Sequence, residues 1–134
     1  MYGKVLLLAA LPFALVACGG SEEDRAAEPV TSYLAALADG DGERACDQLT
    51  GNAQRELIAG LVETLPEAGV MTCEEAVEKM SGIVGPDEAD LLSDAEVEVT
   101  LDGDRGKARP VEGTDTIDVV KSDGRWLIDG GFVF

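Results

Sequence analysis

The sequence predicts an α+β domain in which helices come first and pack on an antiparallel sheet of about four strands. Three observations support this prediction. Between residues 30 and 80 the apolar residues recur every three or four positions, as on one face of a helix. From residue 95 they alternate with polar residues, which is the period of a strand. Asp123-Gly124 is typical of the two-residue turn that joins adjacent antiparallel strands.

Four helices are expected before the sheet. The first begins near Glu28, carries Pro29 in its first turn and ends at Gly40. The others are expected over residues 43–49, over 52–65 with Thr50 as N-cap, and from residue 73 to Gly82 or Gly85 with Thr72 as N-cap.

The strands are expected over residues 95–101, 106–111, 114–121 and 125–134. Pro110 has no amide donor, so the second strand should lie at a sheet edge or contain a bulge. The acidic stretch after Pro86 is expected to form a short turn. In the last strand Trp126, Ile128 and Phe132 should share one face.

Residues 1–17 have the organisation of a signal peptide, since the single cation Lys4 precedes an apolar run that starts at Val5. The run is too short to span a membrane, which takes roughly 20 apolar residues. Its last residues, Leu-Val-Ala17-Cys18, resemble the lipobox of bacterial lipoproteins. The resemblance implies cleavage after Ala17 and attachment of a diacylglyceryl group, with acyl chains such as palmitate, to Cys18. The alternative is a plain secretory signal that leaves Cys18 as a free thiol.

The lipobox implies that the mature protein is anchored by lipid to the outer face of the cell membrane. Residues 18–28 are then expected to be the lipidated Cys18 and a flexible acidic tether, because Gly-Gly-Ser-Glu-Glu-Asp has nothing to bury. Residues 29–134 would form the folded domain, which is long enough for one hydrophobic core.

The charge excludes one class of partner. The chain carries a formal net charge of −17, and the signal peptide contributes only the positive Lys4, so the mature part is near −18. Such a surface repels polyanions, and we therefore expect no nucleic-acid partner.

Cys46 and Cys73 remain once Cys18 is assigned to the lipid. An even pair in an exported domain predicts one disulfide, which would close a loop of about 28 residues. Two thiolates alone do not make a zinc site, and the chain has no His to complete one. No metal or cofactor is expected.

The order of these elements resembles the NTF2-like superfamily, and more closely its small exported lipoproteins. The resemblance covers residues 28–134 and depends on two stretches, the first helix that ends before Asp39-Gly-Asp-Gly42 and the closing Asp123-Gly-Arg-Trp126 hairpin. It implies a cone: a bent sheet wrapped around a long helix, with a cavity open at one end. Members of the superfamily include isomerases, dehydratases, small-molecule binders and docking modules, so the fold does not select the function.

Three residues are candidates to line such a cavity. Tyr33 and Trp126 lie on apolar faces, and the simpler expectation is that both are core aromatics. Asp129 lies out of phase with the apolar positions of its strand, and the simpler expectation is that it faces solvent. Residues 39–43 carry carboxylates at alternate positions, but Arg44 and Thr50 stand where a calcium loop needs Gly and Glu. Termination of one helix and capping of the next account for this stretch.

These observations favour a non-enzymatic, membrane-anchored domain that binds a small apolar molecule or an envelope protein. A scaffold that docks or forms a homodimer through its open sheet face is the alternative. An enzyme is the least favoured expectation, because the chain lacks His, the side chain that titrates most readily near neutral pH.

Overall fold

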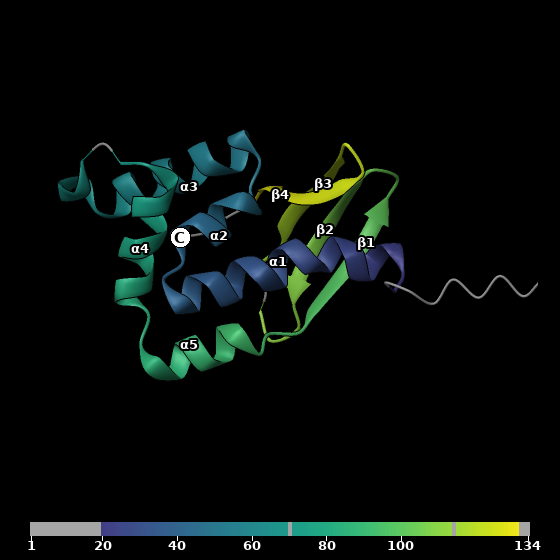
Figure 1. Ribbon diagram of the computed structural model, residues 1–134, viewed down its shortest axis with the longest axis horizontal. Coiled ribbons are helices and arrows are strands. Elements are labelled where there is room, and N and C mark those ends of the chain that lie inside the picture. Colours follow the sequence, from purple (N-terminus) through teal and green to yellow (C-terminus); the bar gives the residue numbers. More distant parts are fainter. Residues whose placement is uncertain (1–19, 70, 114, 132–134) are drawn as a thin grey trace, which may run out of the picture.

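A computed structural model describes residues 20–69, 71–113 and 115–131. It confirms the α+β class, with helices first and an antiparallel sheet after them (Figure 1). The helical elements described are α1 (Glu22–Asp39), α2 (Gly42–Asp47), α3 (Gly51–Thr64), the 3-10 turn η1 (Pro66–Ala68), α4 (Cys73–Ile83) and α5 (Pro86–Ser93). The strands are β1 (Val97–Asp102), β2 (Arg105–Pro110), β3 (Ile117–Ser122) and β4 (Arg125–Gly130).

The four strands form an antiparallel sheet in the order β1-β2-β3-β4. Its inner face, which packs on α1, carries the buried side chains of Ala108, Val119 and Ile128. Its outer face carries mostly charged side chains. The free edge of β4 is partly covered, because the Ile128 amide donates to the Gln48 carbonyl (2.8 Å) and the Thr50 amide donates to the Ile128 carbonyl (2.8 Å).

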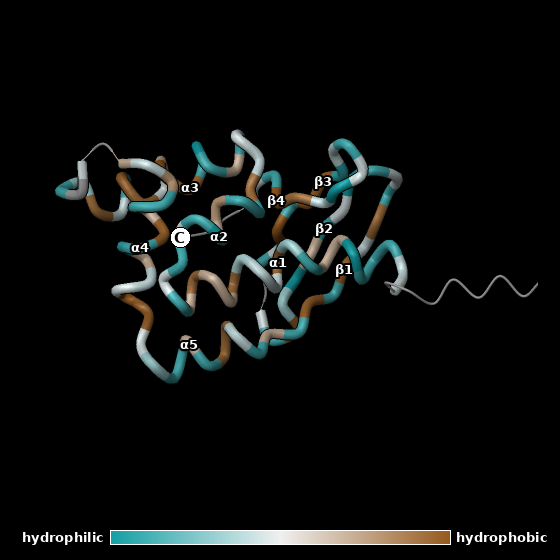
Figure 2. Tube along the Cα trace, in the orientation of Figure 1, coloured by the Kyte–Doolittle hydropathy of each residue, from teal (hydrophilic) through white to brown (hydrophobic). Residues whose placement is uncertain are grey.

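Helix α1 lies across the inner face of the sheet and supplies much of the core (Figure 1). Its residues Val30 and Tyr33 are buried with Leu57 of α3 and with the inner face of the sheet. A smaller cluster of Leu61, Met71 and Ala76 lies between α3 and α4. Figure 2 shows apolar residues recurring along the helices and strands, while the hairpin turns are hydrophilic.

The start of α1 corrects the predicted tether of residues 18–28. The helix begins at Glu22, and Ser21 caps it: its hydroxyl accepts from the Asp24 amide (3.2 Å) and the Asp24 carboxylate accepts from the Ser21 amide (3.2 Å). Ala26 is fully buried, so the stretch does have something to bury. Pro29 consequently lies inside the helix rather than in its first turn.

The stretch after Pro86 is also corrected, because it forms the two-turn helix α5 rather than a short turn. Pro86 occupies the first helical position, where its missing amide donor is not needed. No residue of α5 is fully buried, and only Leu92 packs against the main core as a half-buried side chain. Its weak apolar periodicity gives little sign of a helix, although Pro86 followed by Asp87 and Glu88 is typical of a helix start.

Two further expectations concern the strands. Pro110 does not place β2 at an edge or a bulge: β2 is an interior strand, and Pro110 lies at its end, beyond the last β2–β3 pair at Ala108. The proline therefore interrupts no ladder between β2 and β3. The turn prediction is confirmed, since Asp123 (φ 51°) and Gly124 (φ 79°) both have the positive φ of a type I′ hairpin. Phe132 lies outside the described residues.

The first turn of α1 is bound to the sheet by one carboxylate. Glu22 accepts a hydrogen bond from the Trp126 indole Nε1 (2.8 Å) and another from Lys121 Nζ (3.1 Å). These two interactions hold the pKa of Glu22 below its usual value, and the hydrogen bond from Trp126 has the larger effect. The charged carboxylate is thus the form that ties α1 to β3 and β4.

This linkage predicts a pH dependence. A carboxyl group whose pKa is lowered by folding stabilises the fold above its unfolded pKa, about 4.3, and that contribution is lost as the pH falls through the folded pKa. We expect Glu22→Gln to lower the melting temperature at pH 7, with the difference from wild type narrowing below about pH 4. Glu23→Gln, which removes the neighbouring exposed charge, is the control and should have a smaller effect. Equal effects of the two variants at pH 7 would contradict the role of Glu22.

Candidate functional site

A groove of about 640 Å³, which we name the outer-face groove, lies among the described residues. Its volume falls within the range typical of small-molecule sites, roughly 300–1,000 Å³. Most of its exposed lining is apolar, including the aliphatic stems of charged side chains. It is lined by Thr100, Leu101 and Asp102 of β1, Arg105, Gly106 and Lys107 of β2, Asp118 and Val119 of β3, and Asp129 of β4.

Gly106 allows the strands beneath this groove to approach closely. A Cβ at this position would lie 2.6 Å from Leu101 Cδ2 and 2.8 Å from the Thr100 carbonyl oxygen, so any larger residue would force the strands to shift. Leu101 is also the residue that pairs with Gly106 in the β1–β2 register. The glycine in β2 is therefore required by packing on the inner face of the sheet, beneath the groove, against the Leu101 side chain.

The charged residues of the outer face are arranged as opposite pairs across neighbouring strands. Lys107 Nζ lies 2.5 Å from the Asp118 carboxylate and Arg109 Nη2 lies 3.0 Å from the Glu98 carboxylate. All four side chains are exposed, so each pair contributes at most about 1 kcal/mol to stability. Their main effect is to make this face locally balanced in charge on a strongly acidic protein.

Asp129 has a structural role at the rim of the groove. Its carboxylate accepts from the Thr50 hydroxyl (2.8 Å) and lies 3.8 Å from Arg105 Nη1, while its backbone carbonyl accepts from Asn52 Nδ2 (3.0 Å). Thr50 in turn caps α3 by accepting from the Ala53 amide (3.1 Å). Asp129 therefore connects the end of β4 to the start of α3.

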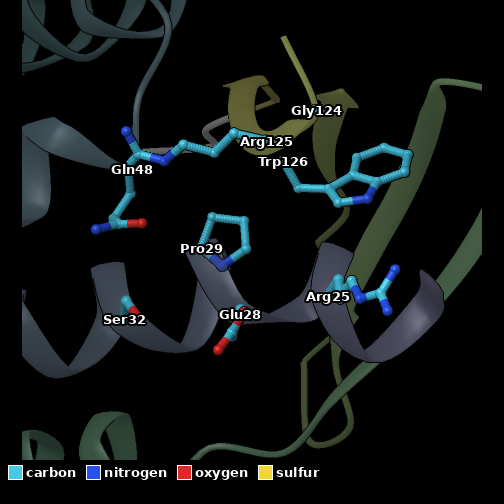
Figure 3. Close-up of a pocket in the computed structure, with 8 residues that line it drawn as sticks. All are labelled: Arg25, Glu28, Pro29, Ser32, Gln48, Gly124, Arg125 and Trp126. Atoms are coloured by element: carbon cyan, nitrogen blue, oxygen red, sulfur yellow. The ribbon is translucent and has the colours of Figure 1, made fainter. Parts of the chain in front are cut away.

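A second, smaller pocket of about 240 Å³ lies between α1 and the β3–β4 turn (Figure 3). The Pro29 ring stands at its centre and the Arg125 side chain extends over it toward Gln48 (Figure 3). The Arg125 Nη2 donates to the Asp47 carbonyl (3.0 Å), which holds the guanidinium at the pocket wall. Its lining residues are Arg25, Glu28, Pro29, Ser32, Gln48, Gly124, Arg125 and Trp126.

The structure does not bring the three candidate cavity residues together. Trp126 lines the smaller pocket and Asp129 lines the outer-face groove, because residues three apart on a strand point to opposite faces. Tyr33 lines neither of these pockets. It is 3% exposed, and burial raises the pKa of its hydroxyl, as expected of a core aromatic. The interior between α1 and the sheet is packed with such side chains.

The predicted disulfide is confirmed between Cys46 of α2 and Cys73 of α4, whose Cα atoms are 6.2 Å apart. Both residues are buried. The two helices also approach closely at Gly42, where a Cβ would lie 2.7 Å from the Glu74 carbonyl oxygen. The bridge thus reinforces an existing helix contact and lies apart from the outer-face groove.

Residues 39–43 serve as helix caps. Gly40 ends α1 in the left-handed conformation (φ 70°), and the Asp41 carboxylate accepts from the Arg44 amide (3.1 Å) at the start of α2. Asp39 pairs with the Arg44 guanidinium (3.3 Å). Among residues 20–69, 71–113 and 115–131, no group of three or more acidic, Cys or His side chains is placed to hold a metal ion.

The sequence prediction missed the cations of the groove, although a signal for them is present. In Arg105-Gly-Lys107-Ala-Arg109 the cations alternate with small residues, which places all three on one face of a strand. The apolar alternation that identifies a strand is nearly absent from β2, so only this alternation of cations and small residues marks the exposed face.

Comparison with known proteins identifies no relative: no protein-family model, no curated protein and no solved structure matches the chain. Within the described part of the chain, no helix is long and apolar enough to cross a membrane.

Proposed function

We propose that this protein is a non-enzymatic lipoprotein, anchored through Cys18 to the outer face of the cell membrane, that binds a small molecule through its folded domain. The observation that carries the proposal is the sequence Leu-Val-Ala17-Cys18 at the end of a short apolar run with a positive start. The Cys46–Cys73 disulfide supports export, because such bonds persist in oxidising compartments outside the cytoplasm.

We further propose that the domain is an NTF2-like cone. Its support is the element order, with a long first helix laid across an antiparallel meander that ends in the Asp123-Gly-Arg-Trp126 hairpin. Superfamily members that act through a cavity would place the ligand between helix and sheet. Here that space holds Tyr33, Leu57 and Ile128 as packed core, so the proposed ligand site is the outer-face groove instead.

Binding is favoured over catalysis by the chemistry of the groove. Lys107 is paired with Asp118, and the Asp129 carboxylate accepts from the Thr50 hydroxyl and lies near Arg105. Side chains engaged in this way are poor candidates for a general base. An apolar lining with a rim of paired charges suits a small ligand that has an apolar body and a few polar groups.

Replacing Cys18 tests the anchor. We expect Cys18→Ala to move the protein from the membrane fraction to the soluble fraction, because the acyl chains supply about 0.8 kcal/mol of membrane affinity per buried methylene. The double variant Cys46→Ala/Cys73→Ala is the matched control, since it removes cysteines without touching the lipobox, and it should stay in the membrane fraction. Retention of Cys18→Ala in the membrane would refute the proposed anchor.

A further inference from the structure

The folded domain begins very close to the proposed lipid. Only Gly19 and Gly20 separate Cys18 from Ser21, the residue that caps α1. At about 3.5 Å per residue, three residues of fully extended chain reach about 10 Å. A tether of this length holds the first turn of α1 near the headgroups, with no room for the domain to diffuse away from the surface.

One end of the molecule surrounds that first turn. Glu22 is hydrogen-bonded to Trp126 and Lys121, next to the β3–β4 turn, and the Lys121 amide donates to the carbonyl of Asp104 (2.7 Å) in the β1–β2 turn. We name residues 21–25, 102–105 and 122–125 the anchor end. In Figure 1 both turns lie on the same side of the molecule as the start of α1, whereas α4 lies at the opposite end of the long axis.

Both ends of the molecule are acidic, and the anchor end itself contains six acidic and three basic residues. Residues 40–96, which include α2 to α5, contain fourteen acidic and three basic residues, whereas residues 97–131 contain eight acidic and five basic ones. Anionic lipid headgroups repel the first group more strongly than the second. The repulsion acts within about 8 Å of the surface at physiological salt, and both ends are net negative, so the short tether rather than the charge selects the end that faces the membrane.

We propose that the domain stands on the membrane on its anchor end, with the β1–β2 and β3–β4 turns at the headgroups and α4 turned toward the solvent. This inference rests on the proposed lipidation of Cys18 and adds an orientation to it. The interaction surface is the anchor end, and its partner is the lipid surface. A partner protein in solution would then meet the acidic helices first.

Fluorescence quenching tests the orientation. The full lipidated protein, with its native disulfide intact, carries one fluorophore on a new cysteine at Asp104→Cys or at Glu78→Cys; both positions are exposed, one at the anchor end and one on α4. Each is incorporated into vesicles of phosphatidylethanolamine and phosphatidylglycerol that contain a lipid with a quencher on its headgroup. We expect quenching at residue 104 to exceed that at residue 78 several-fold.

A lengthened tether supplies the matched control. Inserting twenty Gly and Ser residues between Gly20 and Ser21 leaves the domain and the lipid unchanged, and it should reduce the difference between the two labels. If the protein with its natural tether floats with the vesicles but shows equal quenching at both positions, the proposed orientation is wrong and the lipid anchor stands. Failure of the protein to float with the vesicles would overturn the lipid anchor and the orientation together.

Discussion

Replacing both Cys46 and Cys73 by Ala is expected to lower the free energy of unfolding by about 3–4 kcal/mol. The bridge joins residues 27 positions apart, so its loss releases a long loop in the unfolded chain. It also removes the covalent link between α2 and α4, whose backbones approach closely at Gly42 and Glu74. Urea unfolding of the oxidised protein and of the double variant measures the difference directly.

The wild-type protein under reducing conditions is the control for this experiment, because it breaks the same bond without changing the sequence. Its free energy of unfolding should fall to within about 1 kcal/mol of the value for the double variant. The remaining difference is expected because the reduced protein keeps two buried Cys side chains where the variant has Ala. A double variant as stable as the oxidised wild type would show that the bridge does not hold the two helices together.

Leu57→Ala is expected to lower the free energy of unfolding by about 3 kcal/mol, within the range of roughly 2–5 kcal/mol for fully buried leucines. Leu57 is completely buried where α3 packs against the main core, beside fully buried residues such as Ile128. Truncation removes its contacts and leaves a cavity between α3 and the sheet. Chemical denaturation with the disulfide intact isolates this effect from that of the bridge.

Leu91→Ala is the matched control for Leu57→Ala. Leu91 is also a helical leucine, but it is 64% exposed on α5, so its truncation should change stability by less than about 0.5 kcal/mol. Similar losses for the two variants would mean that the burial of Leu57 does not stabilise the fold.

The sequence predicts the parts of this fold whose signals are local. The type I′ turn at Asp123-Gly124 and the capped start of α4 at Thr72 follow from residue chemistry that needs no tertiary context. The Cys46–Cys73 bridge follows from the count of cysteines together with the expectation that the chain is exported. Each of these features is found where it was predicted.

The sequence failed where tertiary contacts outweigh composition. The first turn of α1 is acidic and resembles a tether, yet the hydrogen bonds of Glu22 to β3 and β4 and the burial of Ala26 make it part of the fold. Helix α5 has almost no apolar stripe, and it packs along α1 through contacts that the apolar pattern does not specify. The outer-face groove depends on the strand register, which brings Lys107 beside Asp118 and which no local pattern specifies.

We propose that Cys18 is the lipidated first residue of the mature protein. Mass spectrometry of the protein purified from membranes of its own cells tests it most directly. We predict that the amino-terminal peptide begins at Cys18 and carries the added mass of a diacylglyceryl group, and that Cys46 and Cys73 are joined. A mature chain that begins at Cys18 with a free thiol, or that retains residues 1–17, would contradict lipidation at Cys18.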